Sequence, residues 1–304
     1  MSYLHKDKHT FIDAINVASN RFAITHSVAE KDYYVTMILK ELSQRMPFIV
    51  FKGGTSLSKC FKIINRFSED IDITIDTKIS QGQMRRLKES IQDVAKLLGL
   101  NIPNIDETKS RRNYNKYLLQ YQSVIDEEEN SVIAPTVIME TSFTEISFPT
   151  EFHAVDSYIG EMMRAEAPDT LEQFQLNPFD MKVQGINRTL ADKVFLLCDY
   201  YLKGTTDRHS RHIYDIYKLL PLVQQDDDFK TLVHEVRNAR AQTNSCPSAQ
   251  PNINVPEILR SIIAKNIYKF DYENKTSKIL EEPISYDVAI EALRAISVST
   301  IFEN

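Results

Sequence analysis

The segment that constrains the fold most is residues 48–76. Residues 48–51 are apolar and follow Pro47, which ends a preceding helix, so they predict a short strand. Residues 70–76 alternate acidic and apolar side chains, the period of a half-buried strand. A short helix is expected between them, at residues 56–61, and the pattern therefore predicts the beginning of a sheet flanked by helices.

Two glycines lie where the first strand turns into the short helix. Gly53 and Gly54 carry no side chain, so the backbone there can approach a ligand closely. Free N–H groups at the start of a helix favour an anion, and Thr55 and Ser56 add hydroxyl donors. The four residues are candidate phosphate-binding residues, and a plain tight turn is the alternative.

The second strand carries two carboxylates. Asp70 and Asp72 are two residues apart, so on a strand their side chains point to one face, with their backbones about 7 Å apart. Mg²⁺ prefers oxygen ligands and usually keeps sites open for water and substrate phosphate. These acids are the candidate metal ligands, and a simple solvent-facing pattern is the alternative.

A third acid, Glu140, lies within an apolar strand predicted at residues 137–143. Burying an unpaired carboxylate is costly, so this side chain is expected either in the site or facing water. We treat Glu140 as a candidate catalytic residue.

The remaining pattern predicts two regions of different character. Residues 1–155 carry further helices at 9–20, 28–45 and 83–98 and strands at 114–124 and 137–143, with a solvated turn at 126–130. Residues 156–304 are expected to be mainly helical after residue 183. The predicted helices there span residues 189–202, 211–222, 229–240, 256–264 and 286–296. A soft domain boundary is placed near residue 155, close to Pro149.

Composition excludes several classes of protein. The net charge of −6 over 304 residues argues against a protein that coats nucleic acid by bulk attraction. Cys60, Cys198 and Cys246 are far apart, which excludes a disulfide framework and a zinc motif. The N-terminus has no signal-peptide pattern and no apolar run could span a bilayer, so a cytoplasmic protein without a membrane partner is expected.

The motifs resemble those of a known family, the AbiEii/AbiGii-type nucleotidyltransferase toxins of type IV toxin–antitoxin systems, in the DNA polymerase β-like nucleotidyltransferase superfamily. The resemblance rests on several blocks in the family's order. They are Glu30-Lys-Asp-Tyr-Tyr-Val35, Phe51-Lys-Gly-Gly-Thr-Ser-Leu-Ser-Lys59, Arg66-Phe-Ser-Glu-Asp-Ile-Asp72, Arg188-Thr-Leu-Ala-Asp-Lys193 and Arg211-His-Ile-Tyr-Asp-Ile-Tyr217. It implies an α+β fold, with a polymerase β-like nucleotidyltransferase core followed by a mainly helical C-terminal half that completes the active-site cleft.

The resemblance also implies roles for single residues. The glycine block would hold a nucleoside triphosphate, and the paired aspartates would hold Mg²⁺, or Mn²⁺ in its place. Lys193 and Asp215 match a lysine and an aspartate that the family needs for activity, and Lys193 and Arg211 are candidate nucleotide-binding residues. His212 stands where many relatives have aspartate. Ser68 matches a serine that a kinase-type antitoxin can phosphorylate, although a turn serine is the simpler interpretation.

Without the resemblance, the residue pattern leaves the roles of Lys193 and Asp215 open. Lys193 lies beside an apolar helix stripe, so its ammonium group reaches either water or a cleft. Asp215 would pair weakly with Arg211 four residues earlier, orient a neighbouring cation, or act as a base.

The leading functional hypothesis is metal-dependent transfer of a nucleoside monophosphate, with release of pyrophosphate. The resemblance implies a toxin of a toxin–antitoxin or abortive-infection system, an acceptor such as the 3′ end of tRNA, and an antitoxin encoded nearby. Glu140 or Asp215 would accept the proton. Two basic clusters, one at residues 85–88 and one at residues 109–116, are candidates for guiding RNA. A small-molecule or protein hydroxyl acceptor, and a non-catalytic nucleotide-binding or partner-binding protein, are the alternatives.

Overall fold

The computed structural model describes residues 2–125 and 133–303, so the turn predicted at 126–130 lies outside the described residues. The chain divides into two compact units. Unit 1 comprises the chain up to Phe61 together with Ser68–Val183. Unit 2 comprises Lys62–Phe67 and the chain from Gln184 onward.

Unit 1 is built on a mixed six-stranded sheet with the order β3-β4-β2-β1-β6-β5. Its strands are β1 (Ile49–Lys52), β2 (Ile71–Ile75), β3 (Tyr114–Gln120), β4 (Thr136–Ile146), β5 (Thr150–Val155) and β6 (Phe179–Gln184). β1 and β2 are antiparallel, as are β3 and β4, whereas β2 with β4 and β1 with β6 are parallel. The expected α+β class with a mixed sheet and flanking helices is confirmed.

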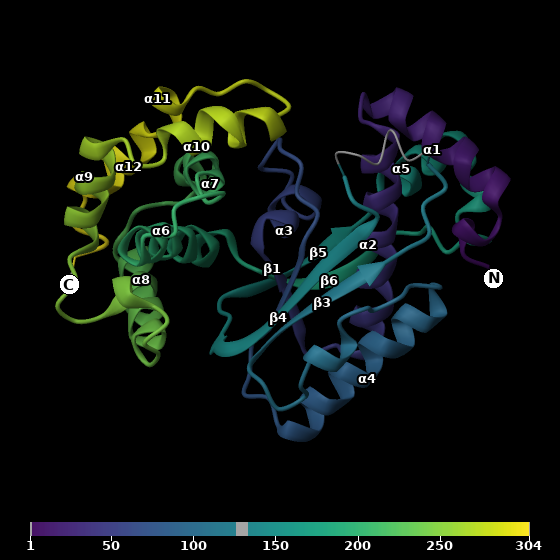
Figure 1. The fold of residues 1–304 in the computed structure, drawn as a ribbon, viewed down its shortest axis with the longest axis horizontal. Helices are drawn as coiled ribbons and strands as arrows, with labels where there is room; N and C mark the ends of the chain where they lie inside the picture. The colour runs from purple at the N-terminus through teal and green to yellow at the C-terminus, as the bar shows by residue number, and fades with distance from the viewer. Residues whose placement is uncertain (1, 126–132, 304) are drawn as a thin grey trace. The chain divides into compact units, whose positions relative to one another are not determined.

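Helices pack on the apolar face of this sheet (Figure 1). Ile71 and Ile73 of β2 are buried in one core with Leu42 of α2 (His26–Arg45) and Ile91 of α4 (Gln81–Leu97). Alternation along β2 therefore leaves Asp72 on the opposite face. The core holds the acidic strand in one register, because a slip by one residue would bury the acid and expose the isoleucines.

The other helices of unit 1 lie at the two ends of its sequence and close to the glycines. They are α1 (Lys8–Phe22), α3 (Gly53–Lys59) and α5 (Tyr158–Glu166). α3 was predicted to begin at residue 56, and in the structure it begins at the first glycine. The predicted strands at 48–51 and 137–143 and the helices at 9–20, 28–45 and 83–98 are confirmed to within a few residues.

The division of the chain differs from the boundary predicted near residue 155. β5, α5 and β6 all lie beyond or across that position, and the compact unit continues to Val183. β6 pairs with β1 in the middle of the sheet, so the sheet needs this late segment. The short segment Lys62–Phe67 belongs instead to unit 2.

Unit 2 is helical in its described residues. Its helices are α6 (Ile186–Lys203), α7 (Arg211–Leu219), α8 (Asp227–Ala241), α9 (Val255–Lys265), α10 (Lys269–Asn274), α11 (Tyr286–Ala289) and α12 (Glu291–Val298). The single helix predicted at 286–296 is two short helices in the structure.

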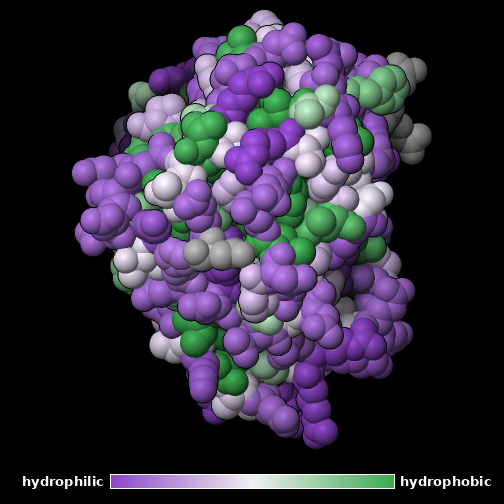
Figure 2. Space-filling model, turned by 90° about the vertical axis from the view of Figure 1, so that its left-hand side faces the viewer, coloured by the Kyte–Doolittle hydropathy of each residue, from purple (hydrophilic) through white to green (hydrophobic). Residues whose placement is uncertain are grey.

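Figure 2 shows a largely hydrophilic surface with scattered apolar patches. No helix among the described residues is both long enough and apolar enough to cross a bilayer.

Candidate active site

Four charged side chains form a row across the polar face of the sheet in unit 1. Asp72 of β2 lies opposite Lys52 of β1 on one side and opposite Glu140 of β4 on the other. Glu140 in turn lies opposite Lys116 of β3. Residues directly opposite one another in paired strands share a face, so the register places two acids side by side with a lysine beyond each.

Gly53 lies directly against the carboxylate of Asp72. It has a φ of 85°, a conformation that favours glycine, and a Cβ atom built on it would lie 2.0 Å from Oδ2 of Asp72. The expectation that the glycine block and the acidic strand are neighbours is therefore confirmed. The missing side chain at this position leaves the space that the carboxylate occupies.

The two hydroxyl residues after the glycines face the protein. Thr55 and Ser56 are buried; Ser56 Oγ donates to the carbonyl oxygen of Gly53 at 2.9 Å. Oγ1 of Thr55 lies 3.0 Å from Oγ of Ser68 in a hydrogen bond. These hydroxyls connect the glycine block to the segment that leads into the acidic strand.

Asp70 directly precedes β2, whereas the alternating pattern predicted it on the strand. The residue before it, Glu69, forms an ion pair with the buried Lys31 of α2. Lys31 Nζ also donates to the carbonyl oxygen of Ala134 at 3.2 Å. The approach to the paired aspartates is thus tied to the core helix by a buried cation.

The next residue of α2 holds the other side of the site. Asp32 forms an ion pair with the buried Lys59 at the end of α3, and its second oxygen accepts from the backbone N–H of Tyr158 at 2.9 Å. Lys59 also donates to the carbonyl oxygen of Asp156 at 3.1 Å. The sequence marked residues 30–35 only through the family resemblance, and a run of charged residues on a helix gave no sign of these partners.

The residues present fit a divalent cation bound together with substrate phosphates. Asp70, Asp72 and Glu140 are partly exposed oxygen donors, and the glycine leaves the Asp72 carboxylate uncovered by a side chain at residue 53. Within residues 2–125 and 133–303, no group of three or more His, Cys, Asp and Glu side chains is arranged to hold a metal ion. Mg²⁺ sites commonly use one or two carboxylates and complete the shell with phosphates and waters, which matches this donor set.

Lys193 and Asp215 meet inside unit 2. Lys193 Nζ of α6 donates to Oδ2 of Asp215 on α7 at 2.6 Å. Asp215 also receives two hydrogen bonds from Arg66, at 2.7 Å to Oδ1 and 2.8 Å to Oδ2. Pairing of Asp215 with Arg211 was one interpretation of the sequence. In the structure Asp215 pairs instead with Lys193 and with Arg66, which lies far away in the sequence.

All three members of this cluster are buried, Asp215 completely. Burial raises the pKa of Asp215, but the charges of Arg66 and Lys193 outweigh it and hold that pKa well below its usual range. Burial lowers the pKa of Lys193, while Asp215 opposes that change. Arg66 was not singled out as a site residue, and its place in the block with Asp70 was the only sequence signal for it.

His212 and its neighbours extend the cluster. The ring of His212 is buried and stacks in a row with His209 and Tyr200, and its pKa is lowered well below the usual value by burial and by the charges of Lys193 and Arg211. Arg211 is partly exposed at the start of α7. The cluster therefore holds more cationic than anionic groups.

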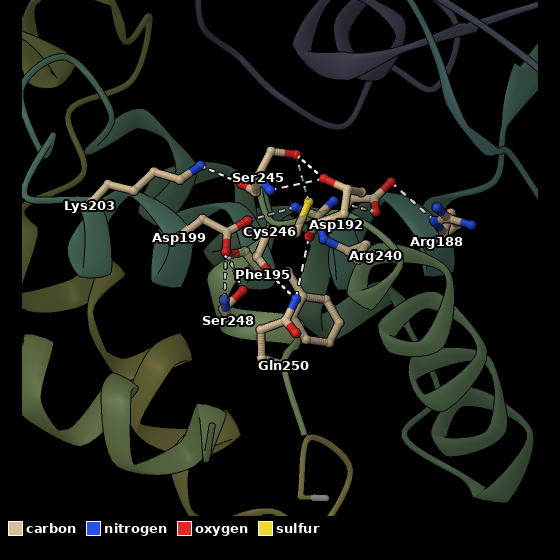
Figure 3. A network of polar contacts seen from close by, with 11 residues as sticks. Arg188, Asp192, Phe195, Asp199, Lys203, Arg240, Ser245, Cys246, Ser248 and Gln250 are labelled. Atoms are coloured by element: carbon tan, nitrogen blue, oxygen red, sulfur yellow. Dashed lines mark hydrogen bonds and ion pairs between the residues drawn. The ribbon is translucent and has the colours of Figure 1, made fainter. Parts of the chain in front are cut away.

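A second polar network fixes α6 from its other side (Figure 3). Asp192 accepts from Arg188 at 3.2 Å and from Arg240 of α8 at 3.4 Å. Arg240 also pairs with Asp199 at 2.8 Å, and Asp199 accepts from the backbone N–H of Ser248 at 2.8 Å. Two neighbouring residues of α6 thus contact different helices: Asp192 contacts α8, and Lys193 contacts α7.

Comparison with known proteins adds to this geometry. The sequence matches the family model described as nucleotidyl transferase AbiEii toxin, type IV TA system, over residues 38–295. Among solved structures it is similar to MenT4, a nucleotidyltransferase toxin from Mycobacterium tuberculosis H37Rv, at 15% sequence identity and a TM-score of 0.50. That similarity covers 94% of this chain and 88% of the other and concerns the fold. None of the curated proteins compared with the sequence matches it.

Proposed function

The chain belongs to the AbiEii family of nucleotidyltransferase toxins, and from this premise we propose that it transfers a nucleoside monophosphate to an acceptor such as the 3′ end of a tRNA. Membership makes the protein a nucleotidyltransferase of a toxin–antitoxin system, with a nucleoside triphosphate as substrate and a cognate antitoxin. The acceptor, the metal ion and the leaving pyrophosphate are parts of the proposal.

One observation carries the proposal, the contact between Gly53 and the Asp72 carboxylate. An acid on a sheet face is common, but here a glycine in a left-handed conformation lets the carboxylate lie directly against the backbone of the turn. A triphosphate on the glycine block would place its phosphates next to an acid that can share a cation with them. A tight turn alone needs no such approach.

The ion would be held by Asp70 and Asp72, with Mg²⁺ the favoured species and Mn²⁺ the alternative. When bound, it would supply charge neutralisation at the α-phosphate and a lower pKa for the attacking hydroxyl. The backbone at Gly53 and Gly54 positions the triphosphate for an acceptor oxygen to attack the α-phosphorus. The bond from that phosphorus to the bridging oxygen then breaks, and pyrophosphate leaves.

Glu140 is the better candidate for accepting the proton of the acceptor hydroxyl. It lies beside Asp72 across the strands and is partly exposed. Asp215 is a poor base, because both of its oxygens already accept hydrogen bonds from cations and its pKa is held below the usual range. We assign Asp215 the role of orienting Lys193 and Arg66.

The surplus positive charge of the second cluster suits a triphosphate. Arg66, Lys193 and Arg211 contribute three cations against the single carboxylate of Asp215. We propose that Lys193 and Arg211 bind the nucleotide phosphates and that Asp215 keeps Lys193 in place.

Ser68 is the proposed regulatory position. Its hydroxyl bonds that of Thr55, so a phosphate on it would add roughly −1.5 to −2 charges beside the glycine block. That charge would repel a bound triphosphate. We therefore expect Ser68→Ala to keep activity and phosphorylated protein to lose it, measured in the same transfer reaction.

The transfer reaction itself is the test. The full chain is incubated with Mg²⁺, each of the four labelled nucleoside triphosphates and total tRNA, and label in RNA is followed. We expect label from at least one nucleotide, released by digestion as a 3′-terminal residue. Labelled protein or small molecule in place of RNA would replace the acceptor, and nucleotide binding without any transfer would contradict the proposal.

A further inference from the structure

A basic track leads from the segment before the edge strand β3 of unit 1 onto the strand itself. It begins at a pocket of about 480 Å³ between α4 and the segment before β3, where Lys88 meets Lys109 and Arg111. One residue of the first basic cluster and two of the second therefore line the same pocket. The one acidic residue in the pocket lining is Asp106.

The segment is fixed in place before any ligand arrives. The side chain of Asn115 bonds both the N–H and the carbonyl oxygen of Lys109, at 2.8 and 3.0 Å. Asn104 bonds the backbone of β3 at Lys116 and Leu118, at 2.9 and 3.0 Å. The backbone that carries these cations is therefore held in place, and such a segment loses less freedom on binding than a mobile loop.

Charge on this segment has one sign. From residue 108 to residue 125 the chain carries Lys109, Arg111, Arg112 and Lys116 and no acidic residue, in a protein of net charge −6. Lys88 Nζ donates to the carbonyl oxygen of Thr108 at 2.8 Å, which holds its charge at the pocket. Arg85 of the same cluster pairs with Glu89 instead, so it contributes less.

β3 itself adds one cation, Lys116, next to an aromatic ring on the face that carries the carboxylates. Tyr114 is half exposed, and it shares its face of β3 with Lys116 because the two are two residues apart. Lys116 lies opposite Glu140, which lies opposite Asp72. Two strand spacings, roughly 10 Å, therefore separate the backbones of Lys116 and Asp72.

We infer that the basic track binds the sugar-phosphate backbone and one unstacked base of the RNA acceptor. Only the direction in which the RNA runs, toward the carboxylates, rests on the proposed function. Lys109 and Arg111 contact phosphates at the far end, Tyr114 stacks on a base, and Lys116 holds the phosphate nearest the carboxylates. Cations before and after an exposed aromatic residue along the chain match single-stranded nucleic acid better than one small anion.

Binding is measured directly, apart from catalysis. A fluorescein-labelled tRNA transcript is titrated with the full chain at several salt concentrations, and nucleoside triphosphate affinity is measured in parallel. We expect Lys109→Ala with Arg111→Ala to weaken RNA binding about tenfold or more and to lower the salt slope by roughly 1 to 2, with nucleotide affinity unchanged. Tyr114→Ala should weaken binding roughly tenfold, and Tyr114→Phe should restore it.

Lys8→Ala with Lys78→Ala is the matched control, because it removes the same charge from exposed positions outside the pocket. Equal losses in both pairs, or RNA binding that neither pair changes, would overturn the inference and leave an acidic protein partner as the occupant of the pocket. If wild type binds RNA through these residues but transfers no label, the proposed function fails and the track stands.

Discussion

The two clusters of ionisable residues that hold the candidate catalytic acids differ in their surroundings. Asp72 and Glu140 in unit 1 are partly exposed on a sheet face, with glycine beside the first of them. Asp215 in unit 2 is fully buried, and two cations donate to its oxygens. Asp72 and Glu140 thus lie on a face that a ligand can reach. Asp215, by contrast, pairs with cations of the protein itself. Substitutions should therefore separate loss of activity from loss of stability.

The largest effect on activity is expected at Asp72, the partly exposed acid beside Gly53. Asp72→Asn keeps the shape of the side chain and removes its charge, so nucleotidyl transfer should fall by about 10³- to 10⁴-fold. Stability to urea should change less than the rate, because this carboxylate lies on the partly exposed face of the sheet. Rates of label transfer and urea unfolding of the same preparation give both quantities.

Asp93→Asn makes the same chemical change at an exposed position of α4. It should leave both the rate and the unfolding midpoint as in wild type. A comparable rate for Asp72→Asn and Asp93→Asn would remove the metal role from Asp72.

The buried acid should show the opposite signature. Asp215→Asn removes the carboxylate with which the buried Lys193 and Arg66 both pair, which should destabilise unit 2 by about 3–5 kcal/mol. Activity should fall as well, since Lys193 loses the group that orients it. Urea unfolding followed by circular dichroism measures the change in the free energy of unfolding.

The exposed ion pair between Asp287 and Lys269 provides the control. Asp287→Asn removes a carboxylate that is 76% exposed, and a surface pair contributes only about 0–1 kcal/mol. An Asp215→Asn protein as stable as wild type but inactive would instead point to direct chemistry at Asp215.

The glycine beside Asp72 should combine both effects at smaller size. Gly53→Ala adds a Cβ atom 2.0 Å from Oδ2 of Asp72 and strains a backbone at φ 85°, which we expect to cost about 1–3 kcal/mol and to lower transfer at least tenfold. Gly99 also has a positive φ, of 68°, with no atom within 4 Å of the added Cβ. Gly99→Ala should therefore show the backbone strain alone, with the rate unchanged.

The local pattern of unit 1 could be predicted from the sequence because it depends on short-range periodicity. Alternation along β2 and the glycine turn identified Gly53 and Asp72 and the face they share. The partners of Asp215 could not be predicted, because Arg66 lies 149 residues away along the chain. β6 was missed for a similar reason, since its place in the middle of the sheet depends on pairing with β1 rather than on its own pattern.

The smallest expected effect is a pH dependence located in the second cluster. Burial, with the nearby charges of Lys193 and Arg211, holds the pKa of His212 well below its usual value, so the unfolded chain binds a proton below about pH 6.5 and the folded chain does not. His212 therefore does not lower the free energy of unfolding above about pH 6.5. Below that pH the free energy of unfolding declines by up to about 1.4 kcal/mol per pH unit because of this one group. His212→Phe keeps an aromatic ring beside Tyr200 and should remove this share of the slope between pH 7.5 and 5.5. His5 in unit 1, whose pKa burial lowers to about 4, retains its own share in the variant. A slope in His212→Phe as steep as in wild type would mean that His212 does not take up a proton on unfolding.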